Sequence, residues 1–165
     1  MATQQSYSPD YLADANDPDL KARHVEAEVM MRAFDYFNAP RGKENRFGVT
    51  RAQLGATEML HANVQLIKKG GPSGGDAHLH FHTNIDSFWM VLKGKVRFYT
   101  EGDAVTGDFG PMQGIFTPRF SRYWFQAISD DDVELLHVFA MAKTGPGADS
   151  GRTYFAPRDS AVTTK

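Results

Sequence analysis

The sequence predicts an all-β fold, a sandwich or barrel, preceded by one helix. After residue 55 the chain alternates between short strand-like segments and clusters of turn-forming residues. Gly70-Gly71-Pro72, Gly94, Pro118 and Ser129-Asp130-Asp131-Asp132 are among these breaks. Short strands separated by turn signals at this spacing are typical of β-sandwiches and β-barrels.

A helix is predicted over about 18–38. Asp17 is a suitable N-cap and Pro18 suits the first helical position. Apolar residues then recur at helical spacing: Leu20, Ala27, Met30, Met31, Phe34 and Phe37. We expect this helix to cover a sheet or a dimer surface. Residues 1–45 are assigned to an N-terminal arm and helix, and 46–143 to the barrel.

The predicted strands lie within seven segments, which are 56–69, 78–82, 86–94, 95–100, 113–118, 123–128 and 133–142. The remaining residues, 144–165, are rich in Gly, Pro, Ser and Thr. We expect little regular structure in this C-terminal tail.

Composition excludes several classes of function. The chain has 165 residues, a formal net charge of -2 and no cysteine. Bulk charge therefore argues against nucleic-acid binding, and disulfides, thiolate metal sites and cysteine nucleophiles are excluded. No run of about eighteen apolar residues and no signal-peptide pattern is present, so no membrane segment is expected and a cytoplasmic protein is predicted.

His78, His80 and His82 are the most informative residues, because side chains two apart on a strand point to the same side. On a strand, the Cα atoms of residues two positions apart are roughly 6.6 Å apart, so two neighbouring imidazoles of this series can converge on one cation. Histidine is the commonest metal ligand near neutral pH. The segment predicts a metal-binding hairpin that faces a cavity.

The spacing around these histidines resembles the first motif of the cupin superfamily. Gly74 is followed by five residues, His80-Phe81-His82, four residues, Ser87, six residues and Gly94. Ser87 stands where that motif has glutamate. The second motif is degenerate: Pro118 is kept, but Met112 and Phe120 replace its glycines, Tyr123 its histidine and Ala127 its asparagine. The resemblance covers about residues 55–142 and implies a cupin-type, jelly-roll β-barrel.

Cupins hold a divalent metal, and the resemblance implies His80 and His82 as ligands here. Iron is the expected metal, with zinc, manganese or nickel as alternatives. We predict Asp86 as the third ligand, although strand alternation turns it away if Ser87 faces inward. His78, His137, Ser87 and Tyr123 stay open as further ligands. A barrel that has lost its metal and kept its cavity is the alternative.

Aromatic residues suggest what the cavity holds. Trp89, Phe98 and Phe125 are expected to face inward and to bind a small aromatic or apolar oxygenated substrate. Tyr123 and His137 are predicted as catalytic residues. Arg97, Arg119 and Arg122 are weaker candidates for binding a carboxylate or phenolate.

The predicted function is that of a metal-dependent cupin enzyme, with a non-haem dioxygenase as the leading reaction type. Three alternatives remain: a non-redox isomerase, lyase or cyclase; a metal-free isomerase or epimerase that uses His and Tyr as acid and base; and a non-enzymatic small-molecule-binding barrel. The resemblance also implies a homodimer.

Overall fold

The computed structural model describes residues 18–29, 31–45, 48–69 and 79–154. The chain forms two units, residues 1–33 and 34–165. The first contains helix α1, Pro18–Val29, which starts as predicted but ends well before residue 38. Asp35 explains part of the difference, because its carboxylate accepts hydrogen bonds from the Phe37 backbone and the Asn38 side chain and so favours a turn. No helix in the described residues has the length and apolarity needed to cross a membrane.

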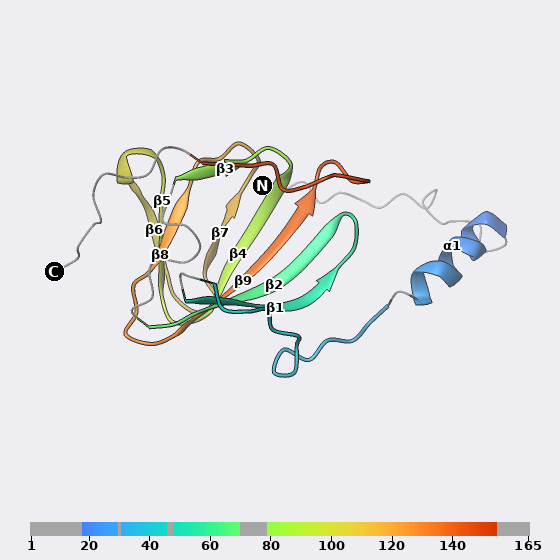
Figure 1. Ribbon diagram of the computed structural model, residues 1–165, viewed down its shortest axis with the longest axis horizontal. Helices are drawn as coiled ribbons and strands as arrows, with labels where there is room; N and C mark the ends of the chain where they lie inside the picture. The colour runs from blue at the N-terminus through green and yellow to red at the C-terminus, as the bar shows by residue number, and fades with distance from the viewer. Residues whose placement is uncertain (1–17, 30, 46–47, 70–78, 155–165) are drawn as a thin grey trace, which may run out of the picture. The chain divides into compact units, whose positions relative to one another are not determined.

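The second unit contains three antiparallel sheets (Figure 1). Strands β1, β2, β9, β4 and β7 lie in that order in the largest sheet, β6-β5-β8 form a second, and β10-β3 form a third. Their bounds are β1 Val49–Ala56, β2 Leu60–Ile67, β3 His80–His82, β4 Ile85–Lys93, β5 Val96–Tyr99, β6 Val105–Phe109, β7 Gly114–Thr117, β8 Trp124–Ala127, β9 Val133–Met141 and β10 Arg152–Tyr154. A 3-10 turn, η2, spans Glu101–Asp103. The prediction of an all-β fold with an N-terminal helix is confirmed.

Strand β10 corrects the prediction for the C-terminal tail. Arg152, Thr153 and Tyr154 pair antiparallel with His82, Phe81 and His80. The short β3 exposes backbone groups that need partners, and the tail supplies them. Strands β1 and β6 also lie outside the segments predicted from sequence.

Both faces of the large sheet carry packed apolar residues. On one face, Ala52 and Val64 pack with Ala39, and the partly buried Tyr36 covers them. Residues 34–45, assigned to the N-terminal arm from sequence, therefore lie in the second unit with the sheet. On the other face, Trp89, Val91 and Leu135 meet aromatic residues of the β6-β5-β8 sheet, Phe98 and Phe125. This second face is the interior of the barrel.

Two residues of the degenerate motif keep a backbone conformation that suits glycine. Met112 and Phe120 both have a φ of 65°. Left-handed backbone is uncommon for residues with a Cβ, and glycine adopts it readily. These are the positions at which the second cupin motif has glycine, so the turns of that motif persist although its residues have changed.

Candidate active site

The barrel interior has a polar zone built by neighbouring strands of the large sheet. Pairing places Gln53 of β1 beside Asn63 of β2, and Asn63 beside His137 of β9. Two residues further along the same two strands, Arg51 of β1 lies opposite Gln65 of β2. Residues opposite each other in antiparallel strands present their side chains on one face. These residues line a cavity of about 230 Å³, whose other walls include His82, Ser150 and Arg152.

His80 and His82 come from β3, and both are buried, as the alternation of that strand requires. Their ring centroids are 5.2 Å apart and the rings are nearly perpendicular. His82 Nδ1 lies 3.3 Å from the Ser150 carbonyl oxygen. A carbonyl only accepts, so Nδ1 carries the proton and Nε2 presents a lone pair.

That Nε2 atom is buried and has no hydrogen-bond partner among the described residues. Burial lowers the pKa of His82 to about 4, and the charges of Arg152 and His80 act in the same direction. His82 is therefore neutral near pH 7, with an unoccupied acceptor beside the cavity.

Tyr123 is buried against the histidines. Its ring centroid is 4.6 Å from that of His80 and 6.3 Å from that of His82. Its backbone also exchanges hydrogen bonds with His80, at 2.9 and 3.2 Å. Burial raises the pKa of the phenol to about 12, whereas Arg152 and hydrogen bonds with Thr117, Trp89 and Ser87 act to lower it. Tyr123 stays protonated and is absent from the described walls of both interior hollows.

Ser87 and His137 belong to a buried polar cluster. His137 Nε2 lies 3.1 Å from Ser87 Oγ, and Trp89 Nε1 donates to Thr117 Oγ1 at 3.3 Å. The imidazole of His137 stacks on the indole of Trp89, with centroids 3.7 Å apart. Burial, followed by the charges of His82, Arg152 and Arg51, lowers the pKa of His137 to about 3.

The donors that the structure describes do not fit the predicted metal centre with three or four protein ligands. Asp86 lies on the opposite side of β4 from Ser87, where it accepts a 2.8 Å hydrogen bond from the Arg119 backbone and pairs with the Arg119 guanidinium. The structure therefore does not bring Asp86 to the imidazoles. No cluster of three or more His, Asp or Glu side chains able to hold a metal exists within the described residues. His78, another candidate, lies outside them.

The predicted substrate-binding aromatics differ in position. Trp89 and Phe125 line a small hollow of about 10 Å³, together with His80, Arg51, Gln65 and Arg152. Phe98 is almost fully buried in the core and is absent from the described walls of both hollows. All three side chains therefore point into the barrel, as predicted. Phe98, however, packs within the core and does not border the cavity.

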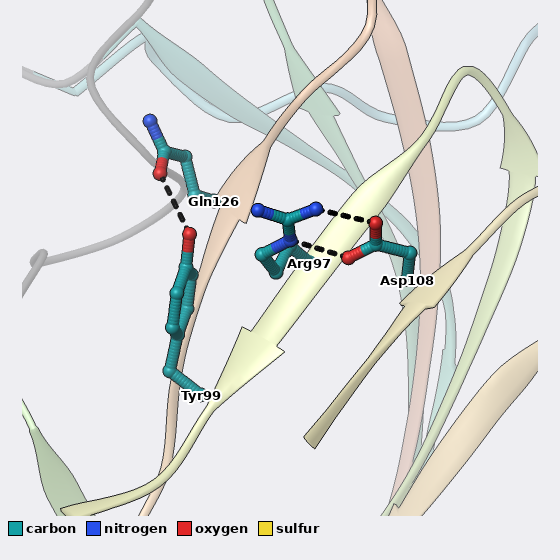
Figure 2. Close-up of polar contacts among 4 residues, drawn as sticks. All are labelled: Arg97, Tyr99, Asp108 and Gln126. Atoms are coloured by element: carbon teal, nitrogen blue, oxygen red, sulfur yellow. Dashed lines mark hydrogen bonds and ion pairs between the residues drawn. The ribbon is translucent and has the colours of Figure 1, made fainter. Parts of the chain in front are cut away.

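The arginines proposed from sequence are paired at the surface. Arg97 of β5 donates to both carboxylate oxygens of Asp108, at 2.5 and 2.6 Å (Figure 2). Arg122 pairs with Glu101 at 2.5 Å, and Arg119 pairs with Asp86. None of the three lines the interior hollows.

Sequence reasoning missed Arg51, Asn63, Gln65 and Arg152. A signal existed for β2, where polar residues alternate with apolar ones along His61-Ala62-Asn63-Val64-Gln65. The apolar set faces the Ala39 side of the sheet, which leaves the polar set inside the barrel. For Arg51 and Arg152 no local signal was available, because neither strand had been predicted.

Similar solved structures support the fold. No protein-family model matches the sequence, and no curated protein matches it. The polyketide cyclase RemF from Streptomyces resistomycificus has a TM-score of 0.59 and 18% identity, over 79% of this chain and 89% of that one. Streptomyces Pac13, described as a nucleoside dehydratase, gives 0.55 and 14%, over 76% and 91%. An RmlC-like cupin from Shewanella frigidimarina gives 0.52 and 16%, over 67% and 91%. This chain therefore has the cupin fold, as its first histidine motif predicted.

Proposed function

We propose that this chain is a small-molecule enzyme that performs proton-transfer chemistry, of the isomerase, lyase or cyclase type, on an oxygenated substrate. The observation that carries the proposal is the buried Nε2 of His82, which has no hydrogen-bond partner among the described residues, on a side chain that lines a polar cavity. An unpaired buried acceptor destabilises a protein by about 1–3 kcal/mol, so a ligand that satisfies it is expected. Similarity in fold to a polyketide cyclase and a nucleoside dehydratase is consistent with such a reaction.

His82 acts as the single acid–base group in this proposal. Its Nε2 lone pair takes a proton from a carbon next to a carbonyl or carboxyl group, and an enolate forms. The imidazolium then returns that proton, either to a neighbouring atom in an isomerisation or to a leaving oxygen in an elimination that releases water. Each route begins and ends with neutral His82 and needs no further reactant.

Ser150 and Tyr123 position this base. The Ser150 carbonyl fixes the proton on Nδ1 and directs Nε2 away from it. Tyr123 packs on His80 and joins its backbone, and so it fixes the strand that carries both histidines. Tyr123 is a positioning residue in this scheme, rather than the catalytic residue predicted from sequence.

Replacement of His82 by glutamine should reduce proton exchange by at least about 100-fold, because glutamine cannot take the proton. The assay incubates a panel of hydroxycarboxylates and hydroxyketones with the protein in D₂O. Proton NMR then follows deuterium incorporation at carbon or loss of water. The control His24→Gln removes an exposed imidazole from α1 and should leave the rate unchanged.

Two results would contradict the proposal: no exchange with any compound, or equal exchange by the parent and His82→Gln. Binding without exchange would instead favour a non-enzymatic binding barrel. Tyr123→Phe separates the two roles considered for tyrosine. A proton donor would lose at least about 100-fold, whereas a positioning residue should lose less.

A metal-dependent enzyme, including the iron dioxygenase predicted from sequence, is a second candidate. The same Nε2 lone pair, beside the His80 ring, favours it. Since no cluster of three or more His, Asp or Glu side chains able to hold a metal exists among the described residues, we expect less than one equivalent of metal in purified protein, and we expect proton exchange to survive chelation. Metal analysis of the parent and of a His80→Ala/His82→Ala variant tests this. One tightly held equivalent in the parent, absent from the variant, together with oxygen uptake, would establish the metal enzyme instead.

A further inference from the structure

We propose that Arg51 and Arg152 hold the acid group of a hydroxylated carboxylic acid, and that Asn63 and Gln65 bind its hydroxyl groups. This inference rests on the proposed function, because it names the substrate class for the same cavity. It uses residues that the histidine chemistry does not.

The two arginines reach the cavity from different sheets. Arg51 belongs to β1 in the large sheet, and Arg152 belongs to β10, which pairs with β3. Both line the main cavity, and both also line the small hollow next to His80. Arg51 and Arg152 are therefore shared by the cavity that His82 lines and the hollow that His80 lines.

Arg152 is also a direct neighbour of the proposed base. It lies opposite His82 in the β3-β10 pairing, so the two side chains share one face. Its charge acts to lower the pKa of His82, Tyr123 and His137. An anion held by Arg152 is thereby placed beside His82.

The charge of the cavity favours an anion. Its described lining includes two arginines and neither aspartate nor glutamate. Guanidinium groups are planar and bind carboxylates through two parallel hydrogen bonds. The two positive charges would offset the charge of the bound carboxylate, and so would ease removal of the adjacent C–H proton that His82 is proposed to take.

The amides supply the evidence for hydroxyl groups. Asn63 Oδ1 and Gln65 Oε1 are buried and have no hydrogen-bond partner among the described residues. Both side chains are more than nine-tenths buried and line the cavity, at 6% and 3% exposure. A carbonyl oxygen can only accept, so the missing partner is a donor. Two buried acceptors close to two arginines match a compact hydroxy acid.

The experiment measures binding of matched acid and amide pairs by isothermal titration calorimetry. The probes are mandelate with mandelamide, salicylate with salicylamide, and gluconate with gluconamide. We expect at least one acid to bind ten-fold or more tightly than its amide. Arg51→Gln and Arg152→Gln should each weaken the acid by about ten-fold or more, as for a lost hydrogen bond to a charged group, and the double variant should bind acid and amide alike.

Control variants separate charge from structure. Arg97 and Asp108 pair with each other on the β6-β5-β8 sheet, away from the cavity residues of β1, β2 and β9. Arg97→Gln should therefore not alter the preference for acid over amide. Arg152→Lys keeps the charge and should retain part of it, whereas a purely structural role would make Lys as harmful as Gln. Thermal unfolding of each variant verifies that the barrel is intact. Gln65→Leu should weaken mandelate more than phenylacetate, which lacks the hydroxyl.

The inference is overturned if no acid of the panel binds, if every acid binds no better than its amide, or if the preference survives in the double variant. Tighter binding of inorganic phosphate than of every acid would also overturn it. Failure of the proposed function gives a different pattern. If acids bind through both arginines but His82→Gln leaves proton exchange unchanged, the result supports the anion site and contradicts the acid–base role of His82.

Discussion

Replacement of Gly114 by alanine should lower the free energy of unfolding by more than about 4 kcal/mol. Single substitutions cause losses of this size only through a few mechanisms, of which overpacking and strain apply here. Gly114 begins β7 and lies opposite Met90 of β4. A Cβ atom at this position would overlap the Trp89 carbonyl oxygen and lie 2.9 Å from Met90 Cα. Backbone atoms cannot rotate away as a side chain can, so β7 would have to separate from β4.

Thermal unfolding measured by circular dichroism verifies this prediction. In a chain of this size the melting temperature should fall by about ten degrees or more. Gly55→Ala is the matched control, because a Cβ atom at Gly55 in β1 meets no atom within 4 Å. Similar melting temperatures for the parent and Gly114→Ala would show that β4 and β7 are not packed as described.

Stability should fall steeply as the pH drops below about 6.5. Burial lowers the pKa of His137 to about 3 in the folded state, whereas an unfolded histidine titrates near 6.5. Between these values the unfolded chain binds the extra proton. The stabilisation is therefore complete above pH 6.5 and is lost progressively as the pH falls toward 3. Each such histidine contributes about 1.4 kcal/mol per pH unit, and His82, with its pKa near 4, acts in the same direction.

Urea unfolding at several pH values between 7.5 and 4.5 measures this slope. His137→Gln should be less steep than the parent by about 1.4 kcal/mol per pH unit, because glutamine has no proton to gain. Glutamine can still hydrogen-bond Ser87, which keeps the polar cluster filled. Equal slopes for the two proteins would mean that His137 is not held neutral by burial. His24→Gln, which changes an exposed histidine of α1, should match the parent.

The sequence predicts the fold well because its strands are short, rich in large apolar residues and separated by turn signals. The strands that the sequence did not predict lack this apolar pattern or this length. In β1, Thr50, Arg51 and Gln53 dilute the apolar pattern, and β10 contains only three residues. Pairing between β10 and β3 joins segments about seventy positions apart, and no local pattern encodes such a contact.

The candidate site was predictable in part. Alternation correctly buried His80, His82 and Ser87 on inward faces. The carboxylate of Asp86 has the chemistry of a metal ligand, but the alternation of β4 turns it to the outer face, where it accepts a hydrogen bond from Arg119. Phe98 was correctly placed inward, but the sequence does not reveal which inward side chains fill the barrel and which border the space that remains. That division depends on packing between sheets.

Within the described residues, three residue pairs join β3 to β10, whereas eight pairs join β2 to β9. Regions with few backbone hydrogen bonds open locally at a lower free energy than the core of a domain. Although β3 is also held by the Tyr123 backbone, strand β10, which carries Arg152, pairs with β3 alone among the described strands and is consequently the least firmly attached of them. Solvent and solutes would reach the interior most readily by transient separation of this strand, while the large sheet keeps its register.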